Sequence, residues 1–229
     1  MTPTLLAIAA VAVPFALIAT VRVGLTLTTR FDGHVLNPPS ADVPVHAIAG
    51  GQAAARARAE LRKWCFDGAG PGHAPIWAPW SAPRVDQRFS VAVFTGHAPT
   101  LHALSQDFAC ELDGTRLLQA CGTSAQRLAL RLRVKMHDCL WWRRRDERDP
   151  WDAGTLQTTP DVPRHLARFR PRRATLIVAE ASSADHLKHC ISVLDSHRAE
   201  FRHPVRLLVL GEGGVEVALP GVKRISLEG

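Results

Sequence analysis

The chain has 229 residues, of which 46% are hydrophobic and 21% charged, and its formal net charge is +7. This composition excludes a disordered chain and predicts one packed domain of ordinary size with an appendage. The positive charge is typical of proteins that meet nucleic acid, anionic lipid or nucleotides, although biased codon usage also explains an excess of arginine over lysine. The five cysteines are scattered and include no C-x-x-C pair, which argues against a disulfide framework or a zinc ribbon and favours reduced thiols.

The first apolar stretch covers residues 5–21 without a charge, and residues 23–27 extend it beyond Arg22. About 20 mainly apolar residues cross a bilayer, so the sequence predicts a transmembrane anchor within residues 1–29. Basic residues follow this stretch and none precedes it, which places the body of the chain on the cytoplasmic side of the inner membrane as a single-pass protein. A cleaved signal peptide is an alternative, although a basic start and a clean A-x-A site are missing, and a soluble helix is another.

Residues 30–87 are expected to form a linker that contains one helix. A proline-rich spacer at Asn37–Pro44 precedes a strongly helix-forming segment at Gln52–Trp64. Clustered glycine and proline at residues 67–83 then exclude helix and central strand. The folded domain is therefore expected to cover residues 88–229.

Three apolar runs within this domain have the pattern of buried parallel strands, at Val91–Phe94, Ala174–Glu180 and His203–Gly211. Helical patterns separate them; after a turn at Gly96, for example, apolar residues recur at helical spacing up to Leu112. Alternation of strand and helix predicts an α/β fold, with a mainly parallel sheet and flanking helices.

Two segments of the domain are harder to assign. Arg116–Cys121 is expected to be a second strand after a turn at Asp113–Gly114. Residues 126–142 alternate apolar and polar residues as a strand would, but their length and a capping residue at Thr123 or Ser124 favour a helix. Such a helix aligns Arg127, Arg131 and Lys135 on one stripe. Ser182 or Ser183 is expected to cap a later helix, and two short edge strands are expected at residues 215–219 and 223–227.

The strand that turns into a helix at Gly96, the strand that ends at Glu180 and the strand Val205–Leu210 together resemble the P-loop NTPases. The resemblance is closest to the bacterial branch related to signal-transduction and AAA-type ATPases, and it covers residues 89–210. It implies a nucleotide-binding loop around Gly96, Thr100 and His102, and a Walker-B-like acid at Glu180.

The loop departs from the family pattern G-x-x-x-x-G-K-[ST] at the positions that hold phosphate and magnesium. Leu101 stands for the second glycine, His102 for the lysine and Ala103 for the hydroxyl residue, while Pro99 removes a backbone donor. The resemblance therefore implies an NTPase-like fold that hydrolyses nucleotide weakly or not at all. No catalytic residue and no required cofactor are assigned, although ATP with magnesium remains a candidate ligand.

Two arginine-rich stretches suggest a nucleic-acid contact as an alternative function. Interleaved acidic residues favour a solvated surface loop for the first of these stretches. A metal site is not predicted, because His186 and His189 have no evident third ligand, and His97 with Glu180 is a weak acid/base candidate. The arginines of the two stretches are Arg143, Arg144 and Arg145, and Arg168, Arg170, Arg172 and Arg173.

The sequence thus favours a non-catalytic, membrane-anchored interaction or scaffold protein that carries a degenerate P-loop-like domain and binds protein partners. The alternatives are an atypical nucleotide-binding regulator or weak NTPase, and a nucleic-acid-binding module.

Overall fold

The computed structural model describes residues 32–40, 51–67, 88–139, 149–180, 183–212 and 222–227. The predicted transmembrane anchor, the predicted strand at residues 215–219 and the arginines 143–145 lie outside these residues. Among the residues that are described, no helix has the length and apolar character needed to cross a membrane.

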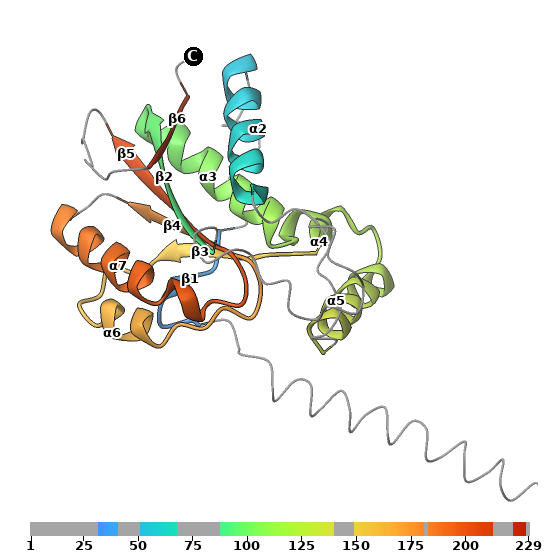
Figure 1. The fold of residues 1–229 in the computed structure, drawn as a ribbon. Helices are drawn as coiled ribbons and strands as arrows, with labels where there is room; N and C mark the ends of the chain where they lie inside the picture. The colour runs from blue at the N-terminus through green and yellow to red at the C-terminus, as the bar shows by residue number, and fades with distance from the viewer. Residues whose placement is uncertain are drawn as a thin grey trace, which may run out of the picture.

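A six-stranded sheet forms the centre of the domain, with the strand order β1-β3-β4-β5-β2-β6 (Figure 1). All neighbouring strands are parallel except β1, which runs antiparallel to β3 at one edge. This arrangement confirms the prediction of an α/β fold with a mainly parallel sheet. The strands are β1 (Leu36–Asn37), β2 (Phe89–Gly96), β3 (Asp152–Leu156), β4 (Thr175–Glu180), β5 (Val205–Glu212) and β6 (Lys223–Ser226).

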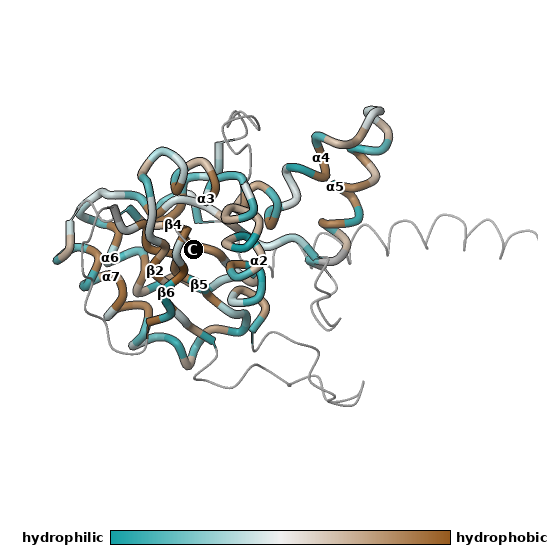
Figure 2. The backbone as a smooth tube through the Cα atoms, turned by 90° about the horizontal axis from the view of Figure 1, so that it is seen from above, coloured by the Kyte–Doolittle hydropathy of each residue, from teal (hydrophilic) through white to brown (hydrophobic). Residues whose placement is uncertain are grey.

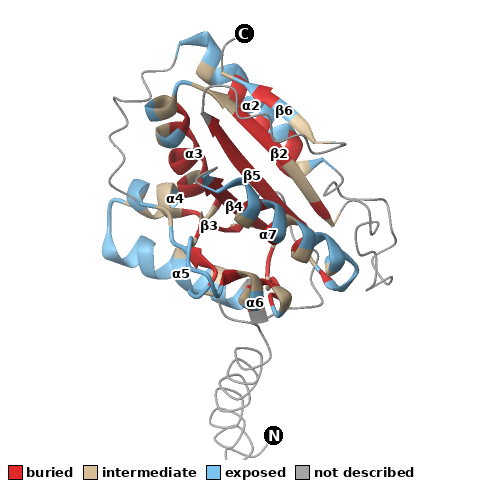
Figure 3. Cartoon of the chain, turned by 90° about the vertical axis from the view of Figure 1, so that its left-hand side faces the viewer, coloured by how far each residue is buried: buried red, intermediate tan, exposed pale blue. Residues whose placement is uncertain are grey.

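Helices cover both faces of this sheet, so the central strands are buried on two sides (Figures 1 and 3). Along β4, Leu176 and Val178 point into the core under one helix layer, whereas Ile177 and Ala179 point into the core under the other. This explains the continuous apolar runs of the central strands. The first layer consists of α2 (Gln52–Phe66) and α3 (Ala98–Leu112), and the second of α6 (Val162–Ala167) and α7 (Ala184–Ser196), followed by a short 3₁₀ turn at Arg198–Glu200.

Two elements from the segment predicted as a linker join this domain. In β1, Leu36 is buried, and the strand passes so close to β3 that a Cβ atom on Gly154 would lie 2.5 Å from the carbonyl oxygen of Asn37. The predicted helix at Gln52–Trp64 is confirmed as α2, which buries Leu61 and Trp64 against α3 and the sheet.

The prediction of a strand at Arg116–Cys121 is wrong, because this segment forms the short helix α4 (Thr115–Ala120). The side chain of Asp113 accepts hydrogen bonds from the backbone N–H (2.7 Å) and the hydroxyl (2.9 Å) of Thr115, which starts a helix directly after the left-handed Gly114. None of the residues of α4 is buried, so the segment lacks the two-sided packing that a central strand needs.

The ambiguous segment after α4 is confirmed as a helix, α5 (Ser124–Cys139). Its start is a capping box: Thr123 Oγ1 accepts from the N–H of Gln126 (3.2 Å), and Gln126 Oε1 accepts from the N–H of Thr123 (3.3 Å). The cap at Ser183 is also confirmed, since its hydroxyl accepts from the N–H of His186.

Candidate functional site

The structure brings together two of the residues singled out in the sequence, His102 and Glu180. β2 and β4 end at Gly96 and Glu180, with β5 between them, so both end at the carboxyl edge of the parallel sheet. His102 lies in α3, which follows β2, and its Nε2 is 3.1 Å from Oε1 of Glu180. The carboxyl edge is where parallel α/β sheets bind ligands, so this pair is the candidate site.

Both partners of this pair are about half exposed, with side-chain exposures of 52% and 50%. Water therefore screens their attraction, and the pair adds little to the stability of the fold. Chemically, the pair offers a carboxylate and an imidazole to an incoming ligand. Glu180 makes its described contact with His102 rather than with His97, the other histidine that the sequence suggested as its partner.

The loop at Gly96 is covered by the end of the chain's last described segment. The N–H of Leu227 donates to the carbonyl oxygen of Thr95 at 2.9 Å, which draws Leu227 across the tip of β2. A Cβ atom on Gly96, whose φ is +156°, would lie 2.8 Å from Cβ of Leu227 and 3.4 Å from Leu101. Glycine is thus required here by the close approach of an apolar side chain.

The start of α3 offers few backbone donors to an anion. Pro99 has no N–H group, and the N–H groups of Thr100 and Leu101 donate to the carbonyl oxygen of His97 at 3.1 and 3.0 Å. A phosphate-binding helix start depends on amides that point at the ligand. Most of the N–H groups at the start of α3 are either missing or already bonded within the helix.

The second arginine-rich stretch is engaged within the fold. Arg170 pairs with Glu200, Arg172 donates to Asp152 at 2.8 Å, and Arg173, which is buried, donates to Asp138 at 2.7 Å. A phosphate contact by Arg173 would leave a buried carboxylate without its partner, which is costly. Arg168 is exposed.

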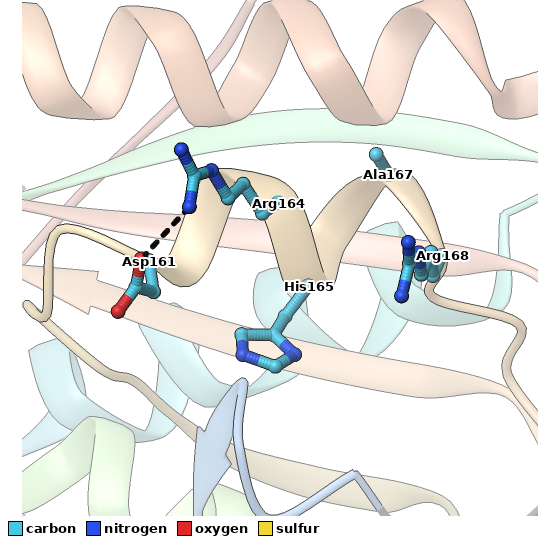
Figure 4. Close-up of a pocket in the computed structure, with 5 residues that line it drawn as sticks. All are labelled: Asp161, Arg164, His165, Ala167 and Arg168. Atoms are coloured by element: carbon cyan, nitrogen blue, oxygen red, sulfur yellow. Dashed lines mark ion pairs between the residues drawn. The ribbon is translucent and has the colours of Figure 1, made fainter.

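A shallow hollow of about 450 Å³ lies along α6, on the other face of the sheet from α3 (Figure 4). In Figure 4 Arg164 reaches toward Asp161, and their charged atoms are 3.7 Å apart. His165, from the same helix, stacks on His34 with ring centroids 5.1 Å apart. No sequence pattern indicates this hollow, because it depends on residue 34 lying against α6. Its lining residues are Asp161, Arg164, His165, Ala167 and Arg168.

The described residues hold no metal cluster, and two of their buried thiols are unreactive. They contain no group of at least three His, Cys, Asp or Glu side chains placed to bind a metal ion. Burial raises the pKa of Cys65 to about 12 and that of Cys190 to about 11, so both thiols stay protonated at neutral pH.

In comparisons with family models, curated proteins and solved structures, nothing matches this chain. The P-loop-like character of the domain therefore stays an expectation from the sequence.

Proposed function

We propose that the protein is a non-catalytic, membrane-anchored interaction protein whose α/β domain is a degenerate P-loop-like domain. The observation that carries this proposal is the contact of Leu227 with Gly96. In a phosphate-binding loop, the space beside this glycine has to stay open for the phosphate. Here Leu227 occupies the space beside Gly96.

The surrounding groups support the same interpretation. Phosphoryl transfer depends on donors and charges that neutralise the phosphate oxygens. At this edge the N–H groups of Thr100 and Leu101 donate to His97, and the imidazole of His102 lies beside the carboxylate of Glu180. The arrangement favours a surface that recognises a protein partner over one that cleaves a triphosphate.

Membrane attachment is the second part of the proposal, and it derives from the sequence. Residues 5–21 are apolar and uncharged, and the arginines that follow them place the domain on the cytoplasmic side of the inner membrane. Extraction of the full chain from membranes only by detergent, and not by high salt or alkali, is the expected result.

The decisive experiment measures thermal unfolding of the full chain in detergent, with and without ATP and magnesium. A ligand at 100 times its Kd stabilises a protein by about 2.7 kcal/mol, so binding would raise the Tm visibly. We expect no shift for the natural chain. Leu227→Ala is the control. A Tm shift with ATP and magnesium in this variant would mean that the Leu227 side chain alone blocks the loop.

An atypical nucleotide-binding regulator is the second candidate, and the proximity of His102 and Glu180 favours it. If ATP with magnesium raises the Tm of the natural chain and His102→Ala removes the effect, this candidate replaces the first. Nucleic-acid binding has less support, because Arg170, Arg172 and Arg173 already have carboxylate partners. A steep salt dependence of DNA binding would revive it.

A further inference from the structure

Helix α5 carries a stripe of large apolar side chains that faces solvent. Leu128, Leu132 and Met136 recur every four residues and are 59%, 53% and 56% exposed. Together with Leu117 of α4, at 54%, they are the large hydrophobic residues that the described part of the chain leaves exposed. Exposed apolar side chains that follow one another along one face of a helix, as those three of α5 do, mark a contact surface.

The opposite side of α5 holds the helix to the domain. Leu130 and Val134 are partly buried, and Asp138 is buried and paired with Arg173, which directly precedes β4. Because successive residues of a helix are about 100° apart, these three lie on the side opposite to the apolar stripe. Figures 1 and 3 show α5 beside the sheet, away from its two covered faces and largely exposed. The apolar stripe therefore faces away from the body of the domain.

Apart from the buried Asp138, which is paired with Arg173, the charged residues of α5 are all basic. No acidic residue occurs between Ser124 and His137. The described residues place no carboxylate within ion-pair distance of Arg131, Arg133 or Lys135. On the helix, Arg131 and Lys135 border the apolar stripe on one side and Arg133 borders it on the other.

We propose that α5 docks on the surface of an anionic lipid bilayer, with Leu128, Leu132 and Met136 inserted at the boundary between headgroups and acyl chains. An apolar stripe bordered by cations matches such a surface, which offers hydrocarbon below and negative charge above. A second copy of the chain is a poorer occupant, since antiparallel or parallel pairing of two α5 stripes brings arginines of both copies together. Nucleic acid would engage the cations and leave the apolar stripe in water.

This inference goes beyond the proposed function and does not depend on the carboxyl-edge site. A terminal anchor alone would leave the domain free to rotate beside the bilayer. Docking through α5 would fix which face of the domain points to the cytoplasm, because α5 is fastened to the body through Asp138 and Arg173.

The test is hydrogen–deuterium exchange of the full chain, read on peptides that cover α5. The chain is placed in vesicles of phosphatidylcholine, and in vesicles of equal parts phosphatidylcholine and phosphatidylglycerol. Docking slows the exchange of the α5 amides by a factor of one plus the docking constant, which is the ratio of docked to undocked helix. This holds whether or not another segment attaches the chain to the vesicle. We expect protection in the anionic vesicles and little in the neutral ones.

Two sets of variants separate the apolar and the electrostatic contributions. Leu132→Gln should lower the docking constant about 10-fold, since it removes one inserted side chain from an exposed position that the fold does not need. Arg131→Gln and Lys135→Gln should each lower it about 5-fold. The matched control is Leu117→Gln, an equally exposed leucine on α4 that lies off the stripe; it should leave the protection of α5 unchanged.

Each other outcome overturns the proposal. Equal protection in neutral and anionic vesicles would remove the role of the cations, and no protection in either would remove the membrane. Protection without vesicles, together with a dimeric mass by light scattering, would assign the stripe to a second copy. An effect of Leu117→Gln as large as that of Leu132→Gln would show a general loss of structure.

Discussion

Two helices of similar length, α2 and α5, are packed differently in this fold. Each contains three arginines and one lysine, and each has an apolar stripe. In α2 the stripe is buried: Leu61 and Trp64 are 0% and 4% exposed. In α5 the equivalent side chains, such as Leu132, are exposed to water. Figure 2 shows α5, with hydrophobic positions in brown, to one side of the body of the domain. Amphipathic periodicity in a sequence thus predicts that a helix has an apolar face, but it does not predict what covers that face.

The charges of the two helices differ in the same way. Arg58 and Arg62 of α2 are one turn apart, and they meet Asp107 and Glu111, which are one turn apart on α3. The cations of α5 have no such ladder among the described residues. Charged residues on α2 therefore strengthen a helix–helix contact inside the domain, whereas those on α5 remain available to a partner outside it.

The largest effect is expected from shortening a leucine on each helix. Leu61→Ala should lower the free energy of unfolding by about 3 kcal/mol, because it removes a fully buried side chain and leaves a cavity between α2, α3 and the sheet. Leu132→Ala should change it by less than about 0.5 kcal/mol. Urea denaturation of the two variants in detergent, followed by circular dichroism, measures both.

Equal losses in the two variants would break the comparison. They would mean that the stripe of α5 is packed in solution as firmly as that of α2. An unchanged slope of the free energy against urea would show that the variants are compared in the same two-state transition.

A smaller effect is expected from the ion-pair ladder. Asp107 is 10% exposed and accepts from both Arg58 and Arg116, the latter through Nε at 2.8 Å. Asp107→Asn should cost about 1.5 kcal/mol, because both arginines are partly open to water and lose only part of their stabilisation. Glu111→Gln, at the more exposed rung, should cost about 0.5 kcal/mol.

The measurement is the same denaturation series, repeated at high salt. Salt should diminish the effect of Glu111→Gln more than that of Asp107→Asn, since screening acts mainly on exposed pairs. The reverse order would indicate that α2 and α3 do not shield the ion pairs of Asp107 from solvent.

The central part of the fold was predictable from the sequence, because buried parallel strands leave continuous apolar runs. The runs that end near Gly96, Glu180 and Gly211 are β2, β4 and β5. The short edge strand β1 was not predicted, since its two residues pair with β3 through backbone atoms that no sequence pattern records. Nor was α4, whose start depends on Asp113 and a left-handed glycine rather than on hydrophobic spacing.

The candidate site was predictable in part. The resemblance to P-loop NTPases implied that His102 and Glu180 belong to the same site, with Glu180 at the carboxyl end of its strand. Their contact at 3.1 Å is set by the side-chain rotamers. The cover of Gly96 by Leu227 was out of reach, since these residues lie at distant points of the chain and meet only through the pairing of β6 with β2.

The smallest effect concerns how each helix begins. α2 starts at Gly51 without a side-chain cap and is held by its packing, whereas α5 starts with both hydrogen bonds of a capping box. Thr123→Ala should therefore lower the stability of α5 by about 1 kcal/mol, which corresponds to about 5-fold faster exchange of its backbone amides. Exchange in α2 and in β5 should stay unchanged, because α5 packs little against them.

Thr123→Ser is the matched control, since its hydroxyl can accept the same bond from Gln126. If Thr123→Ala accelerates exchange throughout the domain, α5 is part of the common folding unit, and the contrast with α2 is one of surface chemistry alone.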